Sequence, residues 1–256
     1  MTKNTSANKL PISVFIITLN EEKHLEEVLA STVDIAEVVI VDSGSTDKTV
    51  AIANRYGAKV YHQDWLGFAK QKQYAMSLCS NEWVLNLDGD EVLNPSMTQR
   101  IKAIIENDEA DSVRFWRNDI FINKKLSPLS RLPKHRRLYK KSKSHFDSSV
   151  LVHEKATVEG KEIFVKEVFD HYGYNSISVL TEKNNQYSCL RAREKHQRQQ
   201  KSSIAKLLFI FPLILFKELF LQRHLFNGRR GFIKSIIAAY YAFSKEAKLF
   251  ELEQLA

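Results

Sequence analysis

The feature that most constrains this chain is an alternation of short apolar runs with helical patterns through its first half. Residues 13–19 and 37–42 are continuous runs rich in valine and isoleucine, typical of strands buried on both faces of a parallel sheet. Between them, residues 22–32 place leucine and valine at helical spacing. Repetition of strand and helix requires right-handed crossovers. We therefore expect an α/β fold with a doubly wound, mainly parallel sheet.

The remaining predicted elements continue this alternation. Further strands are expected at residues 59–62 and 82–88, with a candidate fifth at 112–118, and further helices at 48–56, 68–77 and 95–106. Residues 119–173 show a less regular pattern, and the tail from Ile177 is predicted to be helical. Since ligands of such sheets bind beyond the carboxyl ends of the strands, we expect the functional residues in the loops that follow the strands.

Composition indicates a globular protein with one large domain and an appendage. Hydrophobic residues make up 44% of the 256 residues, enough for a sizeable core. Cys79 and Cys189 form neither a disulfide framework nor a zinc motif, which is typical of a reducing cytoplasm. The first nine residues are polar and lack an apolar core, so no signal peptide is expected.

The formal net charge of +8 is confined to the last quarter of the chain. Residues 1–190 hold 25 basic and 25 acidic residues, whereas residues 191–256 hold 13 basic and 5 acidic residues. The same quarter contains the most apolar run, residues 207–216, which includes Pro212. A bilayer-spanning helix needs about 20 apolar residues. A shorter apolar run within a basic segment favours helices that lie in the interface of an anionic membrane over helices packed in a core.

Carboxylates follow three of the predicted strands. Asp88 and Asp90 flank a glycine at one strand end, and together with substrate phosphates they can bind a hard divalent cation. A common Asp-Gly turn explains the same residues without any ligand. Residues 42–47 and 20–22 follow the second and first strands, and helix capping is the alternative to ligand binding there.

Basic and histidine residues provide further candidates. Lys72 lies near the start of a predicted helix, where positive charge is disfavoured unless an anion such as a diphosphate is close. His153 and Glu154 can supply a general base, although such a pair is more often structural. Arg136, Arg137 and His153 can hold a phosphate or a sugar acceptor, and the two arginines can equally belong to a solvated basic loop.

Taken in order, three segments resemble the family 2 glycosyltransferases of the GT-A fold: residues 16–22 (IITLNEE), 39–47 (VIVDSGSTD) and 84–91 (VLNLDGDE). Later segments resemble the lipopolysaccharide core β-1,4-glucosyltransferases, namely residues 146–154 (ending VHE), 171–174 (HYGY), 183–187 (KNNQY) and 226–232 (FNGRRGF). The likeness extends over residues 12–250.

The resemblance implies roles for the matching residues in donor binding. Thr18, Glu22 and Asp42 would contact uridine, and Asn20 and Ser43 lie in the same two nucleotide-sugar-binding segments. These five residues form the predicted nucleoside-binding part of the site.

The resemblance also implies roles close to the reacting atoms. Lys72 would lie near the nucleotide-sugar, Asp88 would contact ribose or the metal shell, and Asp90 would ligate Mg²⁺ or Mn²⁺. Glu154 would act as the catalytic base, although many members carry an acidic pair where this chain has His153 and Glu154.

The implied reaction is an inverting transfer of one hexose from a UDP-sugar to the inner core of lipopolysaccharide, with heptose as the expected acceptor. Glucose as the hexose rests on the resemblance alone. The QxxRW motif of processive members is absent, which favours addition of a single sugar. Transfer to another lipid-linked saccharide is the alternative. A sugar nucleotidyltransferase ranks lower, because residues 19–22 are acidic where that class has a basic, glycine-rich loop.

The expected organisation has three parts. Residues 1–11 are expected to be disordered, 12–175 to form the GT-A nucleotide-sugar-binding catalytic domain, and 176–256 to form a basic amphipathic helical extension that associates with a membrane. The expected partners are a UDP-sugar donor, a lipid-anchored saccharide acceptor and an anionic membrane surface. Nucleic acid is not expected, because acidic strand ends would repel it. The expected location is cytoplasmic and peripheral, on the inner face of the inner membrane.

Overall fold

The structure is a computed structural model that describes residues 9–147, 155–174 and 176–255. The chain divides into two compact units, each described by itself below. The first comprises residues 1–117 and 134–171, and the second comprises residues 118–133 and 172–256.

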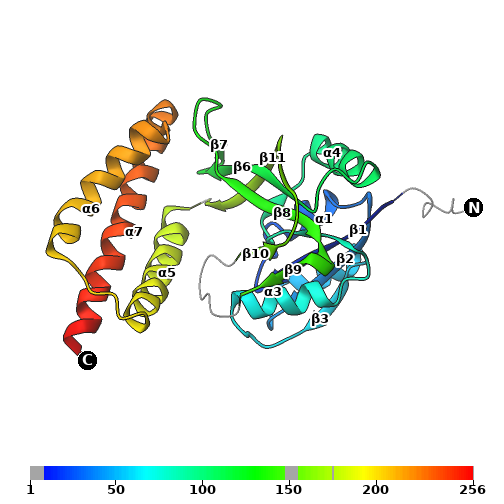
Figure 1. The fold of residues 1–256 in the computed structure, drawn as a ribbon, viewed down its shortest axis with the longest axis horizontal. Helices are drawn as coiled ribbons and strands as arrows, with labels where there is room; N and C mark the ends of the chain where they lie inside the picture. Colours follow the sequence, from blue (N-terminus) through cyan, green and yellow to red (C-terminus); the bar gives the residue numbers. More distant parts are fainter. Residues whose placement is uncertain (1–8, 148–154, 175, 256) are drawn as a thin grey trace, which may run out of the picture. The chain divides into compact units, whose positions relative to one another are not determined.

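One half of the sheet in the first unit is parallel (Figure 1). It contains, in the spatial order β3-β2-β1-β4, the strands β1 (Leu10–Thr18), β2 (Ile35–Asp42), β3 (Lys59–His62) and β4 (Trp83–Asn86). The connections carry the helices α1 (Leu25–Ala30), α2 (Thr49–Arg55) and α3 (Phe68–Ser77). The predicted parallel sheet is therefore confirmed. Its first strand begins at Leu10, inside the segment expected to be disordered, of which residues 1–8 lie outside the described part.

The other half of the sheet is antiparallel where its pairing is recorded. Beyond β4 the order continues with β8 (Lys134–Lys140), β6 (Ser112–Phe121), β11 (Glu162–Tyr174) and β5 (Glu91–Val92). Strand β8 pairs antiparallel with both β4 and β6, and β11 pairs antiparallel with β5. The remaining elements of this region are α4 (Pro95–Glu106), β7 (Lys124–Lys125), the 3₁₀ turn η2 (Lys141–Lys143), β9 (Ser144–Phe146) and β10 (Ala156–Val158).

Much of the middle segment that shows an irregular pattern in the sequence is therefore β-structure. Strand β8 reads KHRRLYK and is rich in basic residues, although it lies between two other strands. The sheet accommodates this charge because acidic partners neutralise it: Arg136 pairs with Glu162, and Lys140 pairs with Asp111 at 3.1 Å. Binary patterning alone does not reveal such a strand.

Alternate residues of β1 serve two separate cores, one on each face of the sheet. Ile12, Val14 and Ile16 are fully buried in the cluster that includes residues of α1, α2 and α4. Phe15 points to the opposite face, where it packs with residues of α3, and its ring centroid lies 6.4 Å from that of Tyr139. The two-residue period of a strand produces this division, and a sheet covered on both faces is what defines a doubly wound fold.

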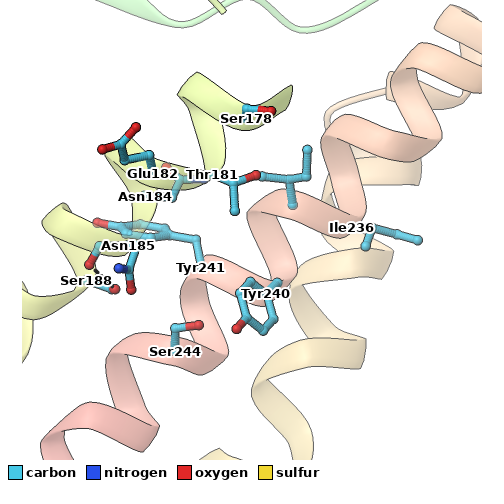
Figure 2. A pocket seen from close by; sticks show the side chains of 11 residues that line it. Ser178, Thr181, Glu182, Asn184, Asn185, Ser188, Ile236, Tyr240, Tyr241 and Ser244 are labelled. Atoms are coloured by element: carbon cyan, nitrogen blue, oxygen red, sulfur yellow. Dashed lines mark hydrogen bonds between the residues drawn. The ribbon is translucent and has the colours of Figure 1, made fainter. Parts of the chain in front are cut away.

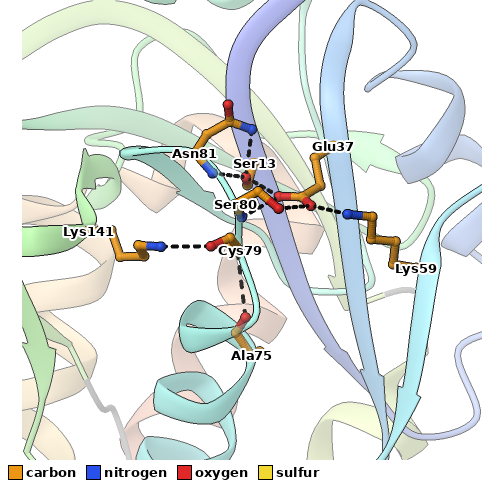
Figure 3. Close-up of polar contacts among 8 residues, drawn as sticks. All are labelled: Ser13, Glu37, Lys59, Ala75, Cys79, Ser80, Asn81 and Lys141. Atoms are coloured by element: carbon orange, nitrogen blue, oxygen red, sulfur yellow. Dashed lines mark hydrogen bonds and ion pairs between the residues drawn. The ribbon is translucent and has the colours of Figure 1, made fainter.

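A polar network fastens the amino-terminal ends of β1 and β2 (Figure 3). The buried Glu37 carboxylate accepts hydrogen bonds from Lys59 Nζ at 2.6 Å, from the backbone N–H and hydroxyl of Ser80 at 2.7 Å each, and from the Ser13 hydroxyl. Burial disfavours the charged form, but these hydrogen bonds outweigh burial and lower the pKa of Glu37 from 4.5 to about 2. The network therefore joins the segment before β4 to the two central strands.

The second unit contains most of the helices that follow the sheet. They are α5 (Ile177–Gln197), α6 (Ile204–Phe216), the π-helical η3 (Lys217–Leu221), the 3₁₀ turn η4 (His224–Asn227) and α7 (Gly228–Leu255). The predicted helical tail is thus confirmed. Small buried residues of α7, such as Ser235 and Ala239, allow close helix packing. None of the helices in the described residues is long and apolar enough to cross a membrane.

Asn227 is the main polar junction between the helices and residues 118–133 of the same unit. Its side-chain carbonyl accepts the Ser127 N–H at 2.6 Å, and its amide donates to the Ser130 hydroxyl at 2.7 Å. Nearby, Lys234 on α7 pairs with Asp119 at 2.8 Å. These contacts attach the 118–133 segment to η4 and α7.

Candidate active site

The ends of the first two strands are locked together by their register. Thr18 pairs with Asp42 across the parallel ladder, and the Thr18 hydroxyl donates to Asp42 Oδ1 at 3.0 Å. Asp42 Oδ2 accepts the N–H groups of Gly44 at 3.0 Å and Ser45 at 2.7 Å. Burial opposes ionisation here, but hydrogen bonds from Ser45, Thr18 and Gly44 lower the pKa of Asp42. Asp42 is therefore a fixed carboxylate at the edge of the sheet.

The loop after β1 is bonded directly to the loop after β2. Asn20 has a left-handed backbone, with φ of 56°, which asparagine tolerates better than most residues. Its N–H donates to the Ser45 hydroxyl at 2.8 Å, and its side-chain oxygen accepts the Thr46 N–H at 2.9 Å. Glu22 receives the Lys48 N–H at 3.0 Å. Asn20 and Glu22 therefore join the two loops, and their bonds are not helix caps because Thr46 and Lys48 precede α2.

The loop after β4 lies against the loop after β1. A Cβ atom added to Gly89 would approach Glu21 Cγ to 2.9 Å, so a larger residue at position 89 would require the Glu21 side chain to shift. The turn is closed by the Glu91 N–H, which donates to the Asp88 carbonyl at 3.0 Å. The structure thus brings the three predicted strand-end loops together at one rim.

A four-residue ion cluster supports this rim. Lys72 Nζ on α3 lies 2.9 Å from Asp88 Oδ1, and Arg137 Nη2 on β8 lies 2.9 Å from Asp88 Oδ2. Arg137 also pairs with the fully buried Glu91, whose Oε2 accepts the Asp88 N–H at 3.2 Å. Burial favours protonation of Asp88, yet Lys72 and Arg137 hold its pKa well below the usual range. Burial raises the pKa of Glu91, with Arg137 opposing it.

Lys72 on α3 is thus placed beside Asp88, and Ser43 is held by Gln71 on the same helix. The Gln71 amide donates to the Ser43 hydroxyl at 3.0 Å. Arg137 is buried within the sheet, which rules out the solvated-loop interpretation for this residue. Its neighbour Arg136 pairs with Glu162.

Asp90 faces His171, which belongs to the segment 171–174 that resembles the core glucosyltransferases. His171 Nε2 lies 3.5 Å from Asp90 Oδ2, and both side chains are nearly buried. The antiparallel register of β5 and β11 places His171 opposite Glu91 and so brings it to Asp90. Half-buried His24 lies in the same electrostatic environment: burial and Lys23 lower its pKa, whereas Asp90 raises it. His153 and Glu154 lie outside the described residues.

Asp90 and His171 are the residues of this rim best suited to a metal ion. Carboxylate oxygen and imidazole nitrogen are both ligands of divalent cations, and Mg²⁺ or Mn²⁺ can complete its shell with phosphate oxygens and water. No group of three or more candidate ligands occurs in the part of the chain that the structure describes. The pair therefore fits an ion that is shared with a phosphorylated ligand.

Comparison with known proteins decides the family. The model of the family described as Glycosyl transferase family 2 matches residues 13–172, which contain the whole rim. The chain belongs to glycosyltransferase family 2. This family 2 glycosyltransferase is 33% identical over 256 residues to the lipopolysaccharide core biosynthesis glycosyltransferase LpsC of Rhizobium meliloti, covering 96% of this chain and 94% of LpsC. It is 35% identical over 253 residues to an uncharacterized glycosyltransferase of Rickettsia conorii, covering 94% and 90% of the two chains.

Solved structures share the fold of this glycosyltransferase. A crystal structure of S. aureus TarS 1-349 superposes with a TM-score of 0.51 at 19% identity, covering 96% of this chain and 90% of that one. The GT-A fold expected from the resemblance is thereby confirmed, and the protein is an enzyme of the transferase class. The sugar nucleotidyltransferase considered from the sequence is excluded by the family.

Proposed function

We propose that this glycosyltransferase transfers one hexose from a UDP-sugar to the inner core of lipopolysaccharide, with inversion at the anomeric carbon. The observation that carries the proposal is the convergence of three strand-end loops beside the Lys72–Asp88 ion pair. A relative of nearly equal extent is named for lipopolysaccharide core biosynthesis. TarS, which shares the fold, has been crystallised with UDP-GlcNAc. Glucose as the hexose and heptose as the acceptor follow only from the sequence resemblance.

The nucleoside end of the donor is assigned to the first two loops. Asp42 is a fixed carboxylate that orders this edge of the sheet through the hydrogen bonds it accepts from Thr18, Gly44 and Ser45, and Ser43 beside it is held by Gln71. Asn20 and Glu22 extend the same edge. Hydrogen bonds to backbone N–H groups fix the side chains of these two loops before the donor binds. Less side-chain freedom is therefore lost when the nucleoside binds, which lowers the entropic cost.

The charge balance of the rim supports a requirement for a divalent cation. Lys72 and Arg137 carry two positive charges, and Asp88 and Glu91 can balance both. Asp90 then adds a negative charge, so a diphosphate would meet no net positive field from these five residues. Mg²⁺ or Mn²⁺ held by Asp90 and His171 would supply that field and neutralise the charge that develops on the departing diphosphate.

The protein's own residues have separate roles in this proposal. Lys72 and Arg137 hold Asp88 ionised and oriented toward the donor. Glu154 is proposed to remove the proton from the acceptor hydroxyl, whose oxygen then attacks the anomeric carbon on the face opposite the nucleotide. The bond from that carbon to the diphosphate breaks, so an α-linked donor gives a β-linked product.

Two variants test these roles with an assay of UDP release from a panel of UDP-sugars and a heptose-terminated core acceptor. In Asp90→Ala, we expect sugar transfer to be lost and not to be restored by added Mn²⁺; retained transfer would contradict the metal role.

In Glu154→Ala, turnover should fall by about 10²-fold or more while UDP binding stays intact. Loss of UDP binding in this variant would contradict the base role. Glu159→Ala, an exposed glutamate close by in sequence, is the control.

We also propose that helix α6 rests on an anionic membrane, which gives the enzyme access to a lipid-anchored acceptor from the cytoplasmic face. None of the residues of α6 is buried, and large apolar side chains along it are more than half exposed, including Ile204 at 78%, Leu208 at 65% and Leu213 at 63%. Exposed apolar surface of this extent on a soluble domain usually marks an interaction site. Basic residues surround it: Lys201, Lys206, Lys217, Arg223, Arg229 and Arg230.

The membrane proposal is tested by cosedimentation of the full chain with vesicles that contain anionic phospholipid. Wild-type protein should pellet at low salt and be released as salt screens the basic residues. Leu213→Glu places a charge on the exposed apolar stripe and should abolish pelleting, whereas Val33→Glu, an exposed apolar position in the first unit, should not. Wild-type protein that stays in the supernatant at low salt would contradict the proposal and leave the assigned chemistry unaffected.

A further inference from the structure

A groove of about 520 Å³ lies between α5 and α7 of the second unit (Figure 2). Pockets that hold small ligands usually measure roughly 300–1,000 Å³, so this one is large enough for a sugar residue. It belongs entirely to the helical unit, and none of its residues has a part in the donor site described above.

The two walls of the groove differ in chemistry. Helix α5 contributes mainly hydroxyl and amide groups, among them Thr181, Asn184 and Asn185, and helix α7 contributes the rings of Tyr240 and Tyr241. One wall thus offers hydrogen bonds, and the other offers flat apolar surface. In Figure 2 the labelled polar side chains Asn184, Asn185 and Ser188 come from α5, and the two tyrosines come from α7.

The polar wall is held in place by a lysine from the opposite helix. Lys248 Nζ donates to Asn185 Oδ1 at 2.6 Å and to the Ser188 hydroxyl at 2.8 Å, and Ser188 in turn donates to the Asn185 carbonyl at 2.7 Å. With its oxygen held by Lys248, the Asn185 amide keeps its NH₂ group as a donor of fixed orientation. Such preorganisation is typical of a binding site, because less side-chain freedom is lost when a ligand binds.

The aromatic wall combines one accessible ring with one inner ring. Tyr240 is 56% exposed at the groove, so its face can pack against a ligand without other rearrangement. Tyr241 is more enclosed, and its buried hydroxyl has no hydrogen-bond partner among the described residues. A buried polar group usually has a partner, so this hydroxyl leaves unmet hydrogen-bonding capacity at the inner part of the aromatic wall.

We infer that this groove binds a neutral sugar residue of the saccharide acceptor. A pyranose has hydroxyl groups around its rim, which suit the amides and hydroxyls of α5, and an apolar C–H face, which suits the ring of Tyr240. The described lining includes the carboxylate of Glu182 and no lysine or arginine, and the N–H donors of nearby Lys248 are taken up by Asn185 and Ser188, so the lining residues offer a sugar phosphate no cationic donor. The inference rests on the proposed function for the acceptor and adds a second contact with it, away from the donor-binding residues.

The test is calorimetric titration of the full chain with a delipidated, dephosphorylated core oligosaccharide in the presence of UDP. Wild-type protein should bind the oligosaccharide saturably. Tyr240→Ala, which removes the exposed ring, and Thr181→Trp, which fills the groove, should each weaken binding at least about tenfold, equivalent to about 1.4 kcal/mol. Phe232→Ala, a half-exposed aromatic residue of α7 outside the groove, should bind like wild type.

UDP affinity and transfer of sugar to a small heptoside, measured on the same variants, separate this inference from the proposed function. Unchanged oligosaccharide affinity in both groove variants would overturn the inference, as would wild-type protein that binds only the phosphorylated oligosaccharide or none. Saturable, groove-dependent binding without any transfer would instead uphold the groove and refute the proposed reaction. Two groove variants are used so that misfolding of one, seen as a lowered unfolding temperature, does not decide the result.

Discussion

The carboxylate of Glu37 provides the most quantitative test of how this fold is held together. We predict that Glu37→Gln destabilises the protein, although the residue lies far from the strand ends that form the donor site. Glutamine keeps the size of the side chain but cannot accept all the hydrogen bonds that Lys59, Ser80 and Ser13 donate to the carboxylate. Buried donors without acceptors carry a desolvation penalty.

The magnitude follows from the lowered pKa of the carboxyl group. The folded protein holds Glu37 at a pKa of about 2, against 4.5 for the ordinary side chain. At about 1.36 kcal/mol for each pH unit, the difference amounts to about 3 kcal/mol of folding free energy. Because the folded-state pKa is the lower one, this contribution is fully present above pH 4.5 and disappears as the pH falls through about 2.

Urea denaturation followed by circular dichroism measures the effect as a change in the free energy of unfolding. At about pH 7, Glu37→Gln should lower that free energy by about 3 kcal/mol, and the difference from wild type should shrink as the pH is lowered below about 4. Glu106→Gln removes a half-exposed partner of Lys102 and should cost under about 1 kcal/mol. A loss for Glu37→Gln no larger than for this control, or a loss that persists unchanged at low pH, would refute the reasoning.

Two other substitutions test the ion cluster and the polar junction of the helical unit. Asp88→Asn removes the shared partner of Lys72 and Arg137, and we expect UDP affinity to fall at least about tenfold in titration calorimetry with a stability loss of about 1–3 kcal/mol; unchanged UDP binding would contradict the role of Asp88. Asn227→Ala breaks the hydrogen bonds to residues 118–133 and should cost about 1–3 kcal/mol in thermal unfolding, while UDP binding stays unchanged.

The parallel half of the sheet and the loops at its edge could be predicted from the sequence because their signals are local. Each strand is a short apolar run, and each following loop carries its polar residues directly after that run. Parallel strands end at the same edge, so Thr18 and Asp42 had to lie side by side once their strands were neighbours. No long-range information beyond the strand order was needed.

The antiparallel half was harder to predict because its residues are stabilised by partners that are distant in sequence. Residues 131–143 contain seven basic residues and no acidic one, a pattern that suits an exposed loop as well as a strand. The burial of Arg137 depends on Asp88 and Glu91, which are 49 and 46 residues away. A single sequence shows neither partner beside it, so a ligand-binding role and a solvated loop explain its charge equally well.

The position of His171 illustrates the same difficulty and shows why it matters for the reaction. Only the pairing of β5 with β11 brings this histidine to Asp90, and a two-residue strand such as β5 has no detectable pattern of its own. Yet Arg137, Glu91 and His171 all depend on this region of the sheet, since Glu91 is both the partner of Arg137 and the register partner of His171. Displacing β5 would therefore disturb Asp88 and Asp90 together, which couples donor orientation to the proposed metal site through one short strand.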